Sequence, residues 1–454
     1  MADISRTSDA VFPVGIALDG AGWHPSAWRD GGAHPERVFT AAYWGAIAEL
    51  AERAGLDYLT ITDALALQED PRAGFGAERA VPPHPVPGIP SGRLDAELIA
   101  SWIAPRTERI GLIPAVTTTH TEPFHVATAL QTLDHVSLGR AGWQLRISPG
   151  AAEAAALGRR PAPGIDPARV AAGEPDPALD ALLDEAADAA EVARRLWDSW
   201  EDDAIIRDAE TGRFLDAERL HHIRFTGEHF SVIGPSIVPR SPQGQLPVTL
   251  LAHSAPVYRL AARAADVVFV TPHPDPATNA SPGARTAAQI VAEIREIEGG
   301  AARAGRGLAP LRIFADLLVA LDGEAGPAGE RPAAAAPETG PERIARLDAL
   351  GIPLASDAHL AAGSASDITE LIEHWREQGI EGVRLRPASN HLDLPAIAQR
   401  LLPELRRRGL GGATPGGGRG AGTTLRERFG LPAAQNRYAS ERRDTIPSTK
   451  ERAA

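Results

Sequence analysis

The chain has 454 residues, of which 43% are apolar, enough for one large hydrophobic core. Its formal net charge of −13 argues against non-specific binding to nucleic acid or to an anionic membrane, because both require clustered Lys and Arg. Cysteine is absent and Lys450 is the only lysine, which excludes thiol nucleophiles and Cys-ligated metals and argues against lysine Schiff bases.

Apolar runs alternate with helical patterns along the chain. Eight runs are expected to form strands, at residues 12–18, 56–62, 110–116, 141–147, 247–251, 267–270, 312–320 and 382–386. Eight helices are expected at 40–54, 94–104, 122–136, 184–200, 255–264, 285–304, 367–378 and 395–408. Strands that alternate with helices indicate a parallel sheet. Eight such units predict a (β/α)₈ barrel, although a doubly wound open sheet fits the same local pattern.

Long Pro- and Gly-rich insertions interrupt this repeat at residues 68–93, 148–183 and 321–341. We expect one barrel domain over residues 1–410, followed by a Gly-rich linker and polar tail over 411–454. The N-terminus has no apolar signal core, and no run of about 18 apolar residues occurs anywhere. The sequence therefore predicts a soluble, cytoplasmic protein without a membrane span.

Polar residues follow several of the predicted strands, at the face of a barrel where function concentrates. Asp63 ends the second strand, and its carboxylate could bind a ligand or cap a helix. Thr117 and Thr118 end the third strand, where hydroxyl groups could bind a heterocycle or serve only as β-formers. Ser254 begins a helix after the fifth strand, which is typical of an anion site and equally of a plain N-cap.

Aromatic residues follow the first predicted strand. Trp23, His24 and Trp28 could line a substrate pocket together with His120, or they could pack on one another in a loop. A metal site is not expected, because His221 and His222 are adjacent and the HExxH pattern is absent. A barrel hydrolase would need a carboxylate pair, for which only Asp63 and Asp316 are suitably placed.

Several longer segments, in this order, resemble the bacterial-luciferase-like superfamily of flavin-dependent monooxygenases. They are similar to the branch that contains nitrilotriacetate and dibenzothiophene-sulfone monooxygenases. The segments are GWHPSAWRD (22–30), AERAGLDYLTITDAL (51–65), TERIGLIPAVTTTHTEPFHVA (107–127), TLDHVSLGRAGWQ (132–144), LWDSWEDDA (196–204), HFSVIGPSIVPRSPQGQLPV (229–248) and LRERFGL (425–431).

The resemblance implies a (β/α)₈ barrel that uses reduced FMN and O₂ to oxygenate a small organic substrate. It also implies a separate flavin reductase and a homodimer or higher homo-oligomer. The cofactor carries most of the chemistry in such enzymes, which suits a chain without cysteine. An oxidoreductase with a deazaflavin coenzyme and a barrel that has lost catalysis are the alternatives.

The resemblance also implies residue roles. Asp63, Thr117, Thr118, Gln144, Ser148 and Ser254 match cofactor-binding positions, with Ser254 at the phosphate. Gln144 stands where the family usually has Asn, and Ala115 where it has Thr. The family's phosphate-contacting His-x-x-x-Tyr element is missing, since Leu179 or Asp180 stands at the His and Leu183 at the Tyr. Arg159 and Arg160 lie near enough in sequence to substitute for it.

Overall fold

Eight parallel strands close into a barrel in the computed structural model, which describes residues 12–67, 88, 90–274, 284–300, 309–323, 337–411 and 422–439. The strands are β1 (Val14–Leu18), β2 (Tyr58–Ile61), β3 (Gly111–Thr117), β4 (Trp143–Arg146), β9 (Val248–Leu251), β10 (Val267–Val270), β11 (Arg312–Leu321) and β13 (Gly382–Pro387). Each strand pairs with the next around the ring, and pairing of β13 with β1 closes it. The predicted barrel is confirmed, and every predicted strand forms within two residues of its expected bounds.

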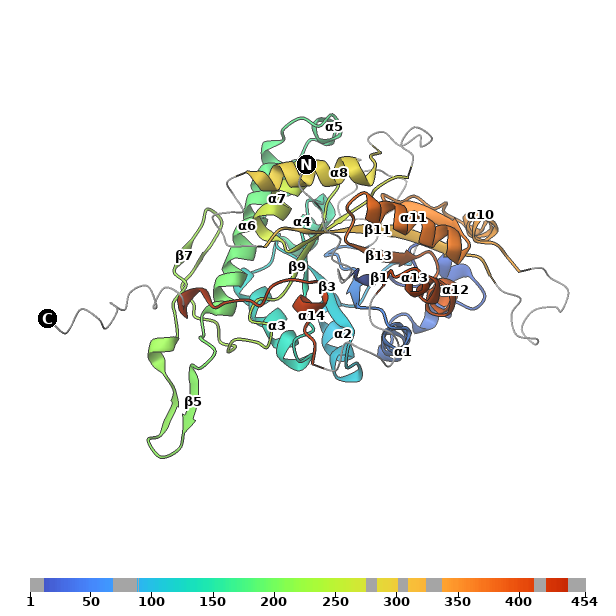
Figure 1. Cartoon of the computed structure of the whole chain (residues 1–454). Coiled ribbons are helices and arrows are strands. Elements are labelled where there is room, and N and C mark those ends of the chain that lie inside the picture. The colour runs from blue at the N-terminus through green and yellow to red at the C-terminus, as the bar shows by residue number, and fades with distance from the viewer. Residues whose placement is uncertain are drawn as a thin grey trace, which may run out of the picture.

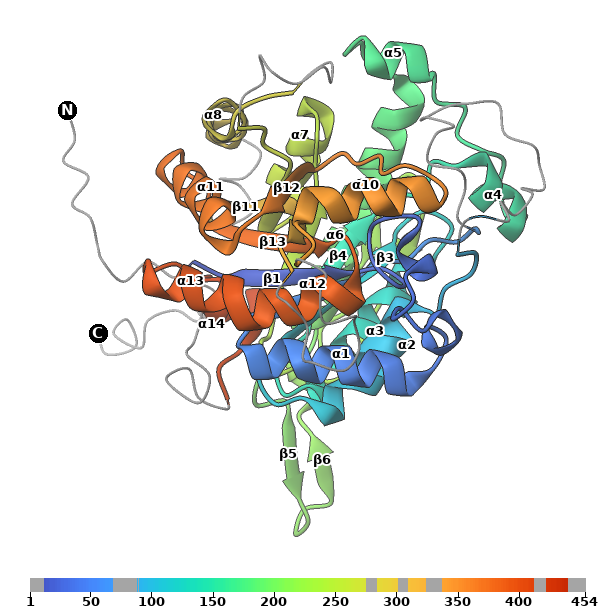
Figure 2. The same cartoon turned by 90° about the vertical axis from the view of Figure 1, so that its right-hand side faces the viewer.

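Helices surround this barrel (Figures 1 and 2). They are α1 (Ala41–Ala54), α2 (Ala96–Ile103), α3 (Pro123–Val136), α6 (Pro177–Asp198), α7 (Ala255–Ala264), α8 (Ala287–Gly299), α11 (Ala365–Glu377), α12 (Asn390–Ala396), a π-helical turn (Ile397–Leu401) and α13 (Leu402–Arg407). Helix α11 begins two residues earlier than predicted, and two others begin at least five residues earlier. Helix α6 starts at Pro177 because the Asp176 carboxylate caps the N–H groups of Ala178 and Leu179. Helix α12 starts before Pro395, which lies inside it.

Smaller elements occupy the insertions. They are α4 (Ala151–Leu157), α5 (Pro167–Ala171), α10 (Gly340–Leu350), and β12 (His359–Gly363), which pairs with β11 outside the ring. The hairpin of β5 (Ile205–Asp208) and β6 (Arg213–Leu215) projects from the barrel in Figure 2, and β7 (Phe225–Thr226) pairs with β8 (Ser231–Val232). Short 3₁₀ turns lie at Ala27–Arg29, Pro35–Arg37, Ala104–Arg106 and Ala217–Arg219. Of the predicted insertions, 68–87, 89 and 324–336 lie outside the described residues, as do 301–304 of the helix expected at 285–304.

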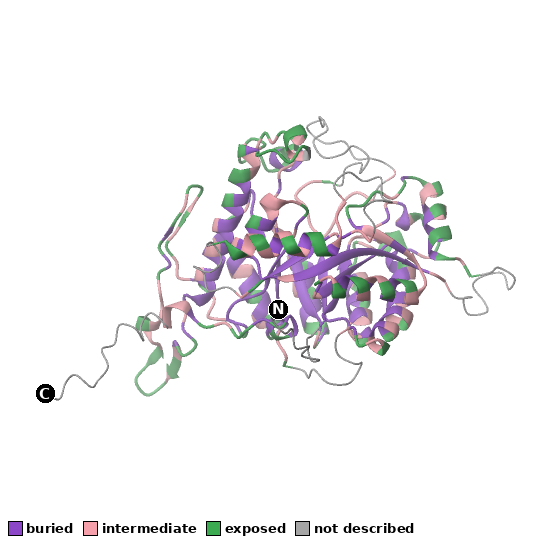
Figure 3. Cartoon of the chain, turned by 45° about the horizontal axis from the view of Figure 1, so that its top comes forward, coloured by how far each residue is buried: buried purple, intermediate pink, exposed green. Residues whose placement is uncertain are grey.

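Burial follows the barrel walls, whose strands are coloured almost wholly as buried in Figure 3. No helix among the described residues is long and apolar enough to cross a bilayer. A second apolar cluster fills the amino-terminal end of the barrel, where α14 (Leu425–Arg428) packs against its base. The Phe429 ring lies 5.1 Å from the Tyr58 ring and 5.3 Å from the Phe314 ring, measured between centroids. A short segment after the last barrel helix therefore closes the barrel floor.

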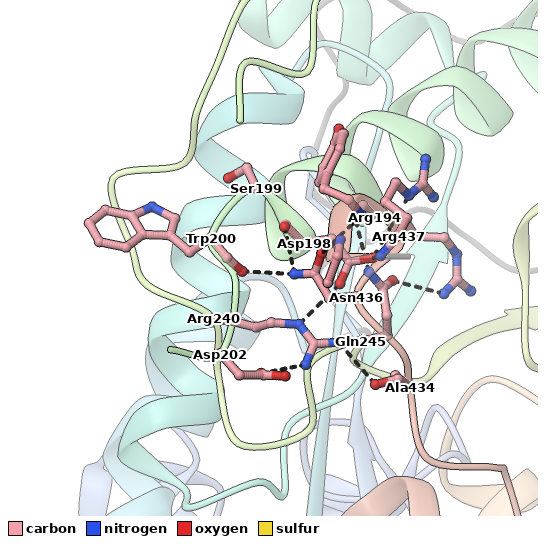
Figure 4. A network of polar contacts seen from close by, with 12 residues as sticks. Arg194, Asp198, Ser199, Trp200, Asp202, Arg240, Gln245, Ala434, Asn436 and Arg437 are labelled. Atoms are coloured by element: carbon pink, nitrogen blue, oxygen red, sulfur yellow. Dashed lines mark hydrogen bonds and ion pairs between the residues drawn. The ribbon is translucent and has the colours of Figure 1, made fainter. Parts of the chain in front are cut away.

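The chain beyond α14 runs along the carboxyl end of α6 (Figure 4). The Asn436 side-chain amide donates hydrogen bonds to the carbonyl oxygens of Asp198 and Trp200, each at 2.8 Å. Arg240 pairs with Asp198 at 3.1 Å and donates to the Ala434 carbonyl at 3.0 Å. Residues 422–439, which fall in the segment expected as linker and tail, thus pack on the barrel.

Replacing Phe429 with Ala should lower the free energy of unfolding by about 3–5 kcal/mol, because it leaves a cavity among the buried rings of the barrel floor. Urea denaturation monitored by fluorescence would measure the change. Phe214 is 61% exposed on the projecting hairpin, so Phe214→Ala is a control that should change stability by only about 0.5 kcal/mol. A similar loss in both variants would contradict the role assigned to α14.

Candidate active site

Two neighbouring cavities open at the carboxyl ends of the barrel strands, where parallel strands bring their terminal residues together. The larger has a volume of about 340 Å³ and the smaller about 260 Å³. Ala115 and Arg146 line both of them. Of the predicted cofactor residues, Gln144 lines the larger cavity, and Asp63, Thr117 and Ser148 line the smaller.

The larger cavity has one apolar wall, formed by Leu183, Leu250, Leu251, Val257 and Leu260. His253 lines the same cavity, and the next residue, Ser254, is the N-cap of α7. The Ser254 hydroxyl makes no capping hydrogen bond to the helix that it precedes. A hydroxyl and unpaired first-turn N–H groups at a helix N-terminus form a site suited to an anion.

The floor of the larger cavity is held by a buried ion pair between β11 and β13. Asp316 is directly opposite Arg384 in the sheet register, and both side chains are at most 2% exposed. Arg384 donates from Nε to Asp316 Oδ1 at 2.9 Å and from Nη2 to Oδ2 at 2.6 Å. It also donates from Nη1 to Gln144 Oε1 at 2.9 Å. Because a guanidinium group only donates, the Gln144 amide must present its oxygen to Arg384, which leaves its NH₂ group for a ligand.

Arg386 extends this network to the rim of the cavity. It donates to Asp316 and, at 2.6 Å, to Asp357, which His253 Nε2 contacts at 3.1 Å. Burial alone would raise the pKa of Asp316, but the guanidinium groups of Arg384 and Arg386 outweigh it and lower that pKa below its ordinary value. The pKa of Asp357 is likewise lowered, since its bonds to His253 and Arg386 outweigh burial. The carboxylates of Asp316 and Asp357 therefore stay ionised at neutral pH.

Asp63 and the threonines make internal hydrogen bonds at the smaller cavity. The Asp63 carboxylate accepts from the N–H groups of Ala64 at 2.7 Å and Ala96 at 2.9 Å, while burial raises its pKa. Ser148 Oγ lies 3.0 Å from both Thr117 Oγ1 and Glu153 Oε1. Asp63, Thr117 and Ser148 thus line the smaller cavity and are also held in place by hydrogen bonds within the protein.

Thr118 is not among the residues that line the smaller cavity. Its N–H and its hydroxyl both donate to the carbonyl oxygen of Arg146, at 2.8 and 3.1 Å. Thr118 therefore joins the ends of β3 and β4. Its assignment to the cofactor stays a prediction, and its observed contacts are structural.

Four carboxyl groups contribute to the lining of the smaller cavity. Asp63, Asp95, Glu97 and Glu122 all contribute to it. Burial, reinforced by the nearby charges of Asp95 and Asp63, raises the pKa of Glu97 to about 7. Glu97 is therefore partly protonated at neutral pH.

The four expected pocket residues are dispersed. Trp23 lines the larger cavity, with its indole 4.4 Å beneath the Arg386 guanidinium. His24 is 1% exposed, and its ring nitrogens contact Asp348 and the Ser26 N–H at 3.0 Å each, outside both cavities. Of these two residues, only Trp23 therefore reaches the site as the described residues outline it.

Trp28 and His120 lie outside the two cavities as well. The Trp28 indole donates to the Gly88 carbonyl at 3.3 Å. His120 is 8% exposed and has a left-handed backbone with φ of 67°, and its ring nitrogens have no partner within the described part of the chain. Burial lowers the His120 pKa, so the ring is neutral near pH 7. Its place in a substrate pocket stays a prediction.

The positions of the missing His-x-x-x-Tyr element lie on α6. Leu183 lines the larger cavity, so an apolar side chain occupies the place expected for a phosphate-contacting Tyr. Arg160 pairs with Glu185 at 2.8 Å and Arg159 with Glu122 at 2.6 Å. Both arginines are thus bound to carboxylates of the chain. Within the described ranges, no group of three or more acidic or histidine side chains could hold a metal ion.

Sequence reasoning missed the Asp316–Arg384–Arg386 network. Its signal is present in β13, where Arg384 and Arg386 alternate with the apolar residues Val383 and Leu385. Such alternation places two charges on the same face of a strand. Asp316, in the middle of the apolar run 312–321, is the matching opposite charge.

Comparisons with known proteins agree with this geometry. Residues 21–382 match the family described as luciferase-like monooxygenase. The chain is 34% identical over 256 residues to N-acetyl-S-(2-succino)cysteine monooxygenase of Bacillus subtilis, covering 56% of this chain and 52% of that protein. It is 31% identical over 306 residues to nitrilotriacetate monooxygenase component A of Aminobacter aminovorans, covering 67% and 61%. The chain thus spans about half to three-fifths of the length of the curated relatives it matches.

Solved structures share the fold over nearly the whole chain. A long-chain alkane monooxygenase superimposes with a TM-score of 0.70 at 21% identity, covering 92% of this chain and 95% of that one. An EDTA monooxygenase from Chelativorans sp. BNC1 gives a TM-score of 0.68 at 20% identity, covering 93% and 99%. At these identities the likeness shows the barrel architecture.

Asp316→Asn should lower the free energy of unfolding by about 3–5 kcal/mol at neutral pH, because it leaves Arg384 buried without its counter-ion. The folded-state pKa of Asp316 lies below its unfolded value, so this stabilisation is complete above about pH 4 and is lost as the pH falls further. Urea denaturation at several pH values would show the difference between variant and wild type shrinking in acid. Asp203→Asn, at a side chain that is 65% exposed, is the control and should change stability by less than about 1 kcal/mol.

Proposed function

The chain belongs to the luciferase-like monooxygenase family, and from that premise we propose that it uses reduced FMN and O₂ to oxygenate a small organic molecule. The observation that carries the proposal is the larger cavity. It joins the Gln144 amide, an apolar wall and the residues that lead to the N-terminus of α7. A flavin mononucleotide offers a planar apolar ring with hydrogen-bond acceptors and a phosphate, which are the groups that this cavity can bind.

The residues of the cavity fit each part of FMN. The free Ser254 hydroxyl and the first-turn N–H groups of α7 would hold the phosphate. The NH₂ group of Gln144, oriented by Arg384, would donate to the ring. Leu250 and Val257 would cover apolar ring surface. When bound, reduced flavin supplies the two electrons with which one oxygen atom of O₂ enters the substrate and the other leaves as water.

The chain's own contribution is to orient the cofactor and to exclude water. The Asp316–Arg384 pair fixes Gln144, and Arg386 holds the face of Trp23 at the rim. The smaller cavity shares a wall with the larger one through Ala115 and Arg146, which is where a substrate could lie beside the cofactor. We propose that Asp63, Thr117 and Ser148 face this shared region.

We further propose that a separate reductase supplies the reduced flavin and that the protein is a cytoplasmic homodimer. The reductase is supported by the relative named as component A of nitrilotriacetate monooxygenase. Apolar side chains that a second copy of the chain could cover are exposed in the segment between α6 and β9. Phe214, Ile233 and Ile237 are 61%, 67% and 72% exposed there.

A deazaflavin coenzyme is the second candidate. The observation that favours it is Leu183, which removes a polar contact expected near the flavin phosphate. Parallel titrations of the purified protein with FMN and with the deazaflavin coenzyme separate the two. A barrel without catalysis would bind one of them and oxygenate nothing.

The proposed reaction is tested with FMN, NADH, a flavin reductase and ¹⁸O₂, together with a panel of small organic sulfur and nitrogen compounds. We expect one ¹⁸O atom in the product of the accepted substrate, measured by mass spectrometry. Because O₂ is the oxygen donor, H₂¹⁸O should leave no label in that product. Product labelled from water, or no product with any compound under conditions in which FMN binds, would overturn the proposal.

Ser254→Ala should weaken the binding of FMN by about tenfold, because a hydrogen bond to a charged phosphate is lost, while leaving riboflavin binding unchanged. Fluorescence titration of both flavins measures the difference. Ser366→Ala on α11 is the matched control and should bind both flavins as the wild type does. Equal weakening of FMN and riboflavin would place Ser254 away from the phosphate.

A further inference from the structure

Arg146 is a half-buried cation that forms no ion pair with a carboxylate of the described residues. It is the last residue of β4 and lines both cavities. Within the described ranges, no carboxylate lies within 4 Å of its guanidinium group, whose hydrogen bond goes from Nη1 to the carbonyl oxygen of Asp63. Ala115 is the other residue common to both cavities, so Arg146 supplies the charge of their shared wall.

Several buried arginines of the protein have their charge compensated. Arg194 pairs with Asp266, Arg343 with Asp393, and Arg384 and Arg386 with Asp316. Arg140 forms no ion pair with a carboxylate in the part of the chain that the structure describes, but it donates to four backbone carbonyl oxygens and to the hydroxyl of Thr107. Removing a charge from water is costly unless a partner compensates it. Arg146 lacks such a direct partner, since the charges of Glu153, Asp63 and Asp19 act on it only from beyond 4 Å, and a bound anion would supply one.

The charges of the two cavities indicate which one holds that anion. Four carboxyl side chains line the smaller cavity, and Arg146 is the only arginine among its described lining residues. An anionic substrate would be repelled there. The larger cavity has Asp357 as its only described carboxylate, and that group is already bound by Arg386 and His253. The anion should accordingly lie on the side of the larger cavity.

We propose that Arg146 binds the reduced flavin ring selectively, as its anion, and so makes the protein prefer reduced over oxidised cofactor. The inference rests on the proposed flavin function. Reduced flavin loses a ring proton near neutral pH, and the negative charge spreads over the pyrimidine side of the ring, whereas the oxidised ring is neutral. A cation beside the ring is one of the groups by which a protein tunes a flavin. Such a preference would favour uptake of reduced flavin from a reductase and release of oxidised flavin after turnover.

The test is an anaerobic titration of the full-length protein with oxidised FMN and with dithionite-reduced FMN. Arg146→Gln should raise the Kd for reduced FMN by about tenfold or more, the effect of losing a charge-assisted contact. It should change the Kd for oxidised FMN by less than about threefold, since the oxidised ring carries no charge. Arg146→Lys keeps the charge and should restore most of the preference.

A second readout does not depend on affinity. The absorbance spectrum of bound reduced FMN at neutral pH reports how much of it is ionised, and this fraction should fall in Arg146→Gln and recover in Arg146→Lys. Arg407→Gln is a control on α13, where the side chain is 67% exposed and paired with Glu404. It should match the wild type in both readouts, and thermal melting should show that all three variants are folded.

The outcomes separate the inference from the proposed function. Equal weakening of both redox forms, or no change in Arg146→Gln while the wild type binds FMN, would overturn the inference alone. The same holds if Arg146→Lys is as defective as Arg146→Gln, because packing and not charge would then be at work. Failure of the wild type to bind FMN in either redox state would overturn the FMN assignment and the inference together.

Discussion

The shared carboxylate of Asp316 is the interaction on which the site depends. Two arginines from the neighbouring strand β13 converge on it inside the barrel, where a charge without a partner would be prohibitively costly. The geometry of these two arginines determines how the other residues at the bottom and rim of the larger cavity are placed. Arg384 aligns Gln144 from β4, and Arg386 reaches Asp357 and the face of Trp23 at the rim. Five separate parts of the chain are thereby held in one arrangement at the carboxyl end of the barrel.

Local patterns in the sequence were enough to predict the eight strands and their alternation with helices, because each strand and helix carries its own signal. The same patterns also fitted an open sheet, and the resemblance pointed to the barrel. The strand at 267–270 is a run of four apolar residues between a buried Asp and a Thr, and it forms with the expected bounds. Helix α6 was harder, since its first turn is formed by Pro177 and an Asp cap inside an Ala/Pro-rich stretch that has the composition of a loop. Propensity is weak in such a stretch, and packing of the helix on α3 and α7 decides its length.

The site was predicted less completely, and the reason is distance along the chain. Asp63, Thr117 and Ser148 could be placed at the mouth because each follows or ends a strand, whereas Gln144 lies within β4 and only the resemblance pointed to it. The partner of Gln144 lies 240 residues away, and no local pattern links the two. The same limit explains His24, whose position after the first strand suggested a ligand contact, although Asp348 from α10 engages its ring. Distant elements become neighbours only in the closed barrel, so the pairing of their side chains cannot be predicted from local sequence patterns.

The position of α14 has a consequence for biosynthesis. Its residues follow the last barrel strand in the chain, so a ribosome completes all eight strands before it makes the segment that covers their amino-terminal end. Until then the rings of Tyr58 and Phe314 face an open barrel base, with apolar surface available to chaperones or to another nascent chain. The barrel of this protein is therefore finished only after the polypeptide has passed its final strand.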